Sequence, residues 1–111
     1  MENYGREELP LSELLMLKGT YGILYHMNGH ALPTLYGYLN EPNLGEQDAR
    51  NYRQQIREIR SLAQGQVEMV QGIIARYPTS SVVQEYWVHI ERLSAEIAGK
   101  TTDEKIDKSG S

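Results

Sequence analysis

Residues 46–77 read EQDARNYRQQIREIRSLAQGQVEMVQGIIARY, and this stretch decides the fold. Apolar side chains recur along it at spacings of three and four, with one four-residue stutter near Gly65. Such spacings place the apolar side chains on one face of an α-helix, as in a heptad seam. The seam consists of Ala49, Tyr52, Ile56, Ile59, Ala63, Val67, Val70, Ile74 and Tyr77. The stretch therefore predicts one helix, on the order of 45 Å long.

A second helix is predicted over residues 81–98, after a break at Tyr77-Pro78. Proline disfavours helix at the residue before it. Ser81 and Gln84 fit an S-x-x-Q capping box, which opens a helix, and Gly99 is a glycine of the kind that closes one. The seam of this helix consists of Val83, Tyr86, Ile90, Leu93 and Ile97. Because the turn is short, we expect the helix to fold back antiparallel on the second half of the long one.

Upstream of the long helix, residues 12–28 predict another helix, with Ser12 as its N-cap. Leu14, Leu17, Tyr21 and Leu24 share one face, but other faces of this helix are apolar as well. A helix that is apolar nearly all round is usually buried on several sides. Gly19 and Gly22 are therefore interpreted as points of close packing against a neighbouring helix. Asn28-Gly29 predicts the end of the helix, since glycine accepts a left-handed conformation.

The sequence thus predicts an all-α fold, a small elongated helical bundle of three main helices and a short helix near 33–39. Residues 1–99 form a single domain, in which residues 1–10 are a polar arm. Residues 100–111 contain one large apolar side chain, which cannot offset the entropy of ordering them. They are predicted to be a disordered tail.

Composition restricts the class of protein. The 111 residues include no cysteine, which excludes disulfides and fits a reducing compartment. No apolar run is long enough to span a membrane, and the N-terminus lacks the apolar core of a secretory signal. The net charge of −4 disfavours nucleic acid as a partner. We therefore expect a cytoplasmic protein that binds neither membranes nor nucleic acid.

No pattern of residues indicates catalysis, a cofactor or a metal. The chain has no nucleophile elbow, no phosphate-binding glycine loop and no HExxH motif. His26 and His30 are four residues apart, but the predicted helix end between them places them on different faces. A zinc site needs three or four ligands, and no further ligand lies nearby in the sequence. The sequence predicts that the protein is not an enzyme and holds no metal.

Residues 19–45 concentrate tyrosine and glycine, in a chain that has no phenylalanine. Tyrosine suits a surface that is apolar toward a partner and hydrated when alone. Tyr36 and Tyr38 are two apart on a short helix, so they point in different directions and are not both expected to be buried. We predict that this stretch is partly core and partly a contact surface, with Tyr25, His30, Tyr36 and Tyr38 as candidate partner-binding residues.

A competing surface is a row of arginines on the long helix. Arg50, Arg53, Arg57 and Arg60 follow one another at spacings of three and four, each one residue past a seam position. The row could present guanidinium groups to an acidic partner. Its alternative role is structural, with aliphatic stems over the core and charges in water, and we favour that role. Trp87 is interpreted as a lid over the core, with a binding anchor as the alternative.

One segment resembles a known family. Residues 67–93 read VEMVQGIIARYPTSSVVQEYWVHIERL, in which Ala75, Arg76, Tyr77 and Pro78 form a turn between two amphipathic helices. This segment resembles part of the small all-helical immunity proteins that neutralise NAD-degrading toxins of bacterial type VI secretion. The resemblance covers about a quarter of the chain, and in that family the turn lies near the N-terminus. It implies a small toxin-blocking protein and assigns no functional residues.

These observations predict a non-catalytic protein-binding module. The preferred form is an immunity or inhibitor protein that occludes a partner toxin or enzyme. The alternative is a structural or adaptor protein that self-associates through the long helix. Because the first and last helices both pack on the long one, we expect a monomer or weak dimer.

Overall fold

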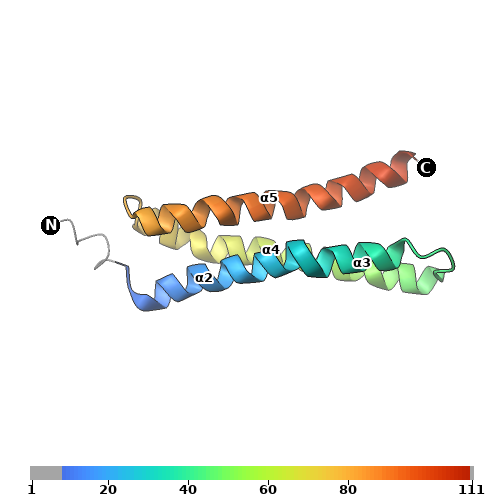
Figure 1. Ribbon diagram of the computed structural model, residues 1–111, viewed down its shortest axis with the longest axis horizontal. Coiled ribbons are helices and arrows are strands. Elements are labelled where there is room, and N and C mark those ends of the chain that lie inside the picture. Colours follow the sequence, from blue (N-terminus) through green and yellow to red (C-terminus); the bar gives the residue numbers. More distant parts are fainter. Residues whose placement is uncertain (1–8, 111) are drawn as a thin grey trace.

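The computed structural model describes the backbone of residues 9–110 and the side chains of residues 9–99 (Figure 1). Its helices are α2 (Leu11–His26), the π-helical turn η1 (Met27–Ala31), α3 (Leu32–Leu39), α4 (Glu46–Arg76) and α5 (Ser81–Gly110). The described residues contain no strand. With principal extents of 63 × 24 × 17 Å, the molecule is an elongated helical bundle, as predicted.

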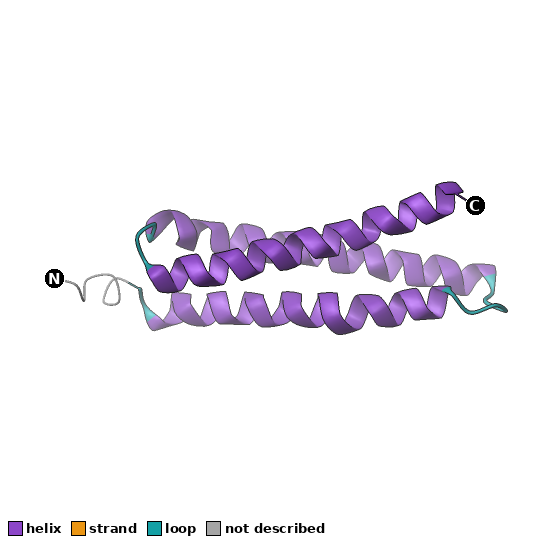
Figure 2. Ribbon diagram, turned by 45° about the horizontal axis from the view of Figure 1, so that its top comes forward, coloured by secondary structure: helices purple, strands orange, loops and turns teal. Residues whose placement is uncertain are grey.

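The core forms along the predicted seams. Every seam residue of the long helix is buried or half-buried, and so are all five of α5. Ile73 is also buried in α4, although the sequence pattern did not include it. In Figure 2, α4 and α5 run antiparallel with the N-terminal helices beside them. Helix α5 packs on α2 and α4, and α3 packs on the first part of α4.

The predicted helix end at Asn28-Gly29 is wrong. Helices α2 and α3 join through η1 into one helix of 29 residues, and no described glycine has a positive φ. The reason lies in the spacing of the leucines that face the core: Leu17, Leu24, Leu32 and Leu39 are separated by seven, eight and seven residues. A π-helical turn takes up the one extra residue in the middle interval. Core packing therefore overrides the local stop signal.

Two predicted caps are also corrected. Helix α2 begins at Leu11 rather than at residue 12, and the carbonyl of Pro10 accepts the amide hydrogens of Glu13 and Leu14 at 3.1 Å. Helix α5 is capped by Ser80, whose Oγ accepts the amide hydrogen of Val83 at 3.3 Å, rather than by Ser81. The buried position of Ser80 selects it over its exposed neighbour.

The C-terminal helix is longer than predicted. Its expected end was residue 98, but the backbone remains helical to Gly110, because Gly99 keeps a right-handed conformation and no proline follows. The backbone of residues 100–110 is therefore helical where a disordered tail was expected. The polar arm lies outside the described residues except for Leu9 and Pro10, as does Ser111.

Two polar contacts fix α2 against α4. The buried Thr20 hydroxyl donates a hydrogen bond to Oε1 of Gln66 at 3.0 Å. Near the start of α2, Glu13 forms an ion pair with Arg76 at the end of α4. Each contact joins residues that are distant in the sequence, and together they set the register of the two helices. Over the part of the chain that the structure describes, no helix has the length and apolar character needed to cross a membrane.

Candidate protein-binding surfaces

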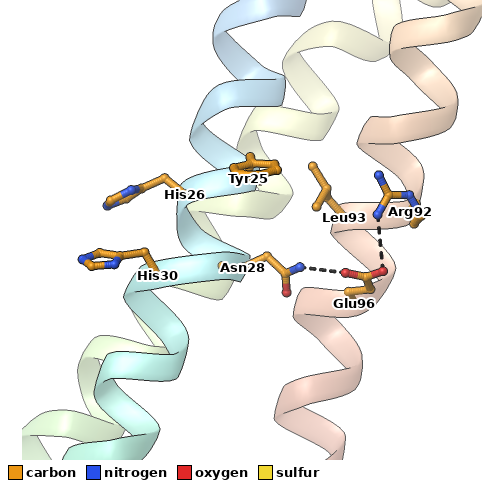
Figure 3. Close-up of a pocket in the computed structure, with 8 residues that line it drawn as sticks. Tyr25, His26, Asn28, His30, Arg92, Leu93 and Glu96 are labelled. Carbon is orange, nitrogen blue, oxygen red and sulfur yellow. Dashed lines mark hydrogen bonds and ion pairs between the residues drawn. The ribbon is translucent and has the colours of Figure 1, made fainter.

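The π-helical turn brings His26 and His30 together. Their rings lie close together, tilted by 37° with centroids 4.9 Å apart, and both residues are exposed. The expectation that they lie on different faces is therefore wrong, because the helix does not end between them. Both rings point away from α5 (Figure 3). Within residues 9–99, no three His, Asp or Glu side chains gather into a group that could hold a metal ion.

A pocket of about 340 Å³ lies where η1 meets α5 (Figure 3). Asn28 of η1 donates a hydrogen bond from Nδ2 to Oε1 of Glu96 at 2.7 Å. Arg92 contacts the same carboxylate at 3.5 Å, and Tyr25 and Leu93 supply the apolar part of the lining. The pocket is partly open to solvent and holds no nucleophile paired with a base. Its residues can receive a side chain of another protein.

The tyrosines separate into exposed and packed residues. Tyr25 is 61% exposed and Tyr38 is 43% exposed. The ring of Tyr38 lies 5.1 Å from that of Tyr52 on α4, which holds it in place at the surface. Tyr36 is half-buried and packs against the core. Of the predicted tyrosines, Tyr25 and Tyr38 are thus the ones that the structure presents to solvent.

The arginine row is not uniform. Arg50 and Arg57 are exposed, whereas Arg53 and Arg60 are half-buried. Arg57 donates a hydrogen bond to Oε1 of Gln54, its neighbour on α4, at 2.6 Å. Half of the row thus lies partly over the bundle, as expected for arginine stems that cover a core.

Trp87 is half-buried against the core, as expected of a lid. It lines a shallow groove of about 630 Å³ between α4 and α5, together with Val67 and Gln71. Part of the Trp87 indole faces this groove, so Trp87 could also serve as a binding anchor.

A polar cluster closes the other end of the bundle. Burial, and next the hydrogen bond and charge of the Glu13 carboxylate, raise the pKa of the Tyr77 hydroxyl above its ordinary value of 10.0. The guanidinium of Arg76, which pairs with Glu13, acts in the opposite direction. The cluster joins the start of α2 to the end of α4, and this position indicates a role in holding the two helices together.

Of the ten large apolar side chains that are exposed among the described residues, five lie on α2, where the sequence did not predict an apolar surface. This helix was expected to be buried on several sides, yet among the described helices it packs toward α4 and α5. A methyl group placed on Gly19 or Gly22 would have no neighbour from another described helix within 4 Å, so none of these helices packs closely on the two glycines. The exposed residues of α2 form what is called here the outer face: Leu11, Ser12, Leu15, Met16, Lys18, Gly19, Gly22, Ile23, Tyr25 and His26.

The outer face is almost uncharged. At neutral pH Lys18 is its only residue with a formal charge, counting histidine as neutral. Helix α4 provides the contrast, because its exposed residues include Glu46, Asp48, Arg50, Arg57, Glu58, Glu68 and Arg76. A group of exposed apolar side chains on one helix, with little charge among them, is typical of an interaction site. The signal in the sequence was the apolar character of α2 on every side.

The chain matches no protein-family model, and searches of curated proteins and of solved structures returned no match. The resemblance of residues 67–93 to the immunity proteins therefore stays a prediction.

Proposed function

We propose that this chain is a non-catalytic protein-binding module. The observation that carries the proposal is the outer face of α2, which exposes Leu11, Leu15 and Tyr25 with a single charged residue among its neighbours. Leaving such side chains in water has a free-energy cost of roughly 25 cal/mol per Å² of apolar surface. Covering the face with protein removes that cost, whereas a small polar ligand would not.

The preferred form of this function is an immunity or inhibitor protein that occludes a toxin or enzyme in the bacterial cytoplasm. Small size, acidic charge and a rigid helical surface support it. Tyr38 is proposed as the anchor, because it is exposed and its ring is held against Tyr52. Arg50 and Arg57 are exposed on the same helix as Tyr52, but on a different face of it, so they are the competing contact surface.

The second candidate is a self-associating structural or adaptor protein. Exposed glycines on the outer face favour it, since they let another helix approach closely. In this form the contact lies on α2, and not on the seam of α4 that the sequence suggested, because that seam is covered within the chain.

A photo-crosslinking amino acid in place of Tyr38, tested in the native cell, distinguishes these forms. An occluding inhibitor gives one dominant cross-linked protein from position 38, identified by mass spectrometry. The same amino acid in place of Gln84, an exposed polar residue at the start of α5, is the control and gives no such product. Cross-links of equal yield from both positions would contradict a specific contact at Tyr38.

The purified pair then tests the residues. Tyr38→Ala is expected to weaken binding about thirtyfold, as for an anchor in a desolvated pocket. Arg57→Ala is expected to have a smaller effect that shrinks further in high salt, because exposed charges are screened over about 8 Å. If Arg57→Ala abolishes binding and Tyr38→Ala does not, the contact is electrostatic and lies along α4.

A further inference from the structure

A second heptad seam runs along the outer face and continues to Gly29 in η1. Leu11, Leu15, Lys18, Gly22, Tyr25 and Gly29 follow one another at spacings of four, three, four, three and four, and all six are exposed. This outer seam lies opposite the one that α2 buries in its own bundle, at Leu17 and Leu24. Spacings of this kind bring side chains into register with a partner helix in a coiled coil. The described part of the chain itself supplies no such helix.

We propose that a second copy of this chain covers the outer seam, with the two α2 helices antiparallel about a two-fold axis near Thr20. The proposal rests on the proposed function only in that α2 is a protein contact surface. In this arrangement Lys18 lies opposite Gly22 of the other copy, Leu15 opposite Tyr25, and Leu11 opposite Gly29. A two-fold contact requires such a self-complementary surface.

The volumes of the side chains fit this pairing. Large residues face small ones at two levels of the seam, where the Lys18 stem meets Gly22 and Leu11 meets Gly29. At the remaining level, Leu15 packs on the ring of Tyr25, which is 61% exposed in the single chain. A Cβ atom built on Gly22 or Gly29 has no neighbour within 4 Å from elsewhere in the described residues, so both glycines leave holes that a partner can fill.

Charge selects the antiparallel direction. A parallel pair would place Lys18 against Lys18 in the middle of the seam, and like charges in a contact oppose it. The antiparallel pair separates them, and each ammonium group reaches water past a glycine. The acidic groups of the chain, with its net charge of −4, are absent from the outer face, so two copies meet there without repulsion between carboxylates.

The exposed area of the seam fits a weak dimer. Leu11, Leu15 and Tyr25 are 68, 55 and 61% exposed. Together these side chains present on the order of 350 Å² of surface. A standard interface buries about 800 Å² on each partner, so the seam, with the backbone of the glycines and the Lys18 stem, makes a contact smaller than the standard size.

The test begins with sedimentation equilibrium of the full chain. We expect a reversible dimer at concentrations of about 100 μM. Gly22→Leu fills the hole opposite Lys18 and is expected to weaken the dimer at least about tenfold. Because a Cβ built at Gly22 meets no other part of the described structure within 4 Å, the monomer is expected to remain folded, as circular dichroism would verify. Gly65→Leu is the matched control: it is also an exposed helical glycine with free space, but on α4, and it leaves the dimer intact.

Disulfide trapping tests the direction, since the chain has no cysteine of its own. A mixture of the Leu15→Cys and Tyr25→Cys chains is expected to form a cross-linked pair on oxidation. Leu15→Cys alone forms little, because ten residues of helix separate the two positions by about 15 Å. Efficient trapping of Leu15→Cys alone would overturn the antiparallel pairing.

A chain that stays monomeric at about 100 μM, or a Gly22→Leu dimer as strong as the parent, would overturn self-association through α2. Either result leaves the proposed function standing, because the cross-link from Tyr38 to a different protein is measured separately.

Discussion

Thr20 shows how a single polar atom is accommodated in this core. Its side chain is fully buried, and its hydroxyl donates to Gln66 across the interface between α2 and α4. A buried hydrogen bond contributes about 1 kcal/mol, but an unpaired partner costs more. The pair therefore specifies how α2 sits on α4 more than it adds to stability.

Thr20→Val is expected to lower the free energy of unfolding by about 1 to 2 kcal/mol, since Gln66 loses its donor while the shape is kept. Adding Gln66→Met is expected to recover most of that loss, because both polar partners are then removed. Urea unfolding of the two variants measures this. If the double variant is less stable than Thr20→Val alone, Gln66 has a further role in the fold.

Because of Tyr77, the folded protein is expected to lose stability at alkaline pH. Burial and the Glu13 carboxylate raise the pKa of its hydroxyl, so the folded state prefers the neutral phenol. This contribution is complete below the unfolded pKa of about 10 and is lost as the pH rises through the raised pKa of the folded state. Tyr77→Phe is expected to flatten the decline in thermal stability between about pH 9 and pH 12 relative to Tyr25→Phe. Equal curves for the two variants would show that Tyr77 does not contribute.

At the scale of the helix, the π-helical turn decides the arrangement. Asn28-Gly29 is a valid stop signal, but η1 continues through it, because ending the helix would misplace Leu32 and Leu35, which are buried. A local signal is worth about 1 kcal/mol, whereas burying a leucine is worth about 1.5 to 3 kcal/mol. The spacing of eight between Leu24 and Leu32 carried the information needed to choose between them.

Deleting Gly29 tests this explanation. The deletion reduces the interval between Leu24 and Leu32 to seven, so a regular α-helix keeps both leucines in the core, and we expect thermal stability to be retained or raised. Deleting Gly22 is the matched control, because it rotates the leading part of α2 by about 100° relative to the core and should unfold the bundle. Thermal melts followed by circular dichroism compare them. Equal destabilisation would show that the turn itself is required.

The helices that the sequence predicted well are those with long seams. Helix α4 has nine regularly spaced seam positions, which determine it independently of its caps. Its observed bounds therefore agree with the predicted range. The pairs Glu13 with Arg76 and Asn28 with Glu96 were not predictable, because residues so far apart meet only once the helices are in register. The outer face was missed for a related reason: apolar spacing shows that a face is to be covered, but not by which chain.

Across the whole molecule, α5 extends beyond the core that the structure describes. Among its residues 81–99, whose side chains are described, Val83, Ile90, Leu93 and Ile97 are buried. The helix continues to Gly110 along the elongated bundle (Figure 1). The part that follows Lys100 includes Ile106 as its one large apolar residue, so this part has little to bury.

Removing residues 101–111 is therefore expected to leave the melting temperature within a few degrees of the parent, since changes at the surface usually cost under about 0.5 kcal/mol. The signal of circular dichroism at 222 nm is expected to fall because helix is lost. Scanning calorimetry gives the melting temperature. A large decrease would mean that the extension docks on the bundle and belongs to the folded unit.

The extra residue in η1 also shows what kind of insertion this helix can tolerate. Three added nucleotides in the codons for Met27–Ala31 turn a seven-residue interval into eight without changing the reading frame. The π-helical turn keeps the core residues in place despite the added residue, and one more side chain is exposed at that position along the bundle. His26 and His30 stand at this level, so a lineage could alter what the rod presents to other proteins by insertion alone, leaving its interior residues as they were.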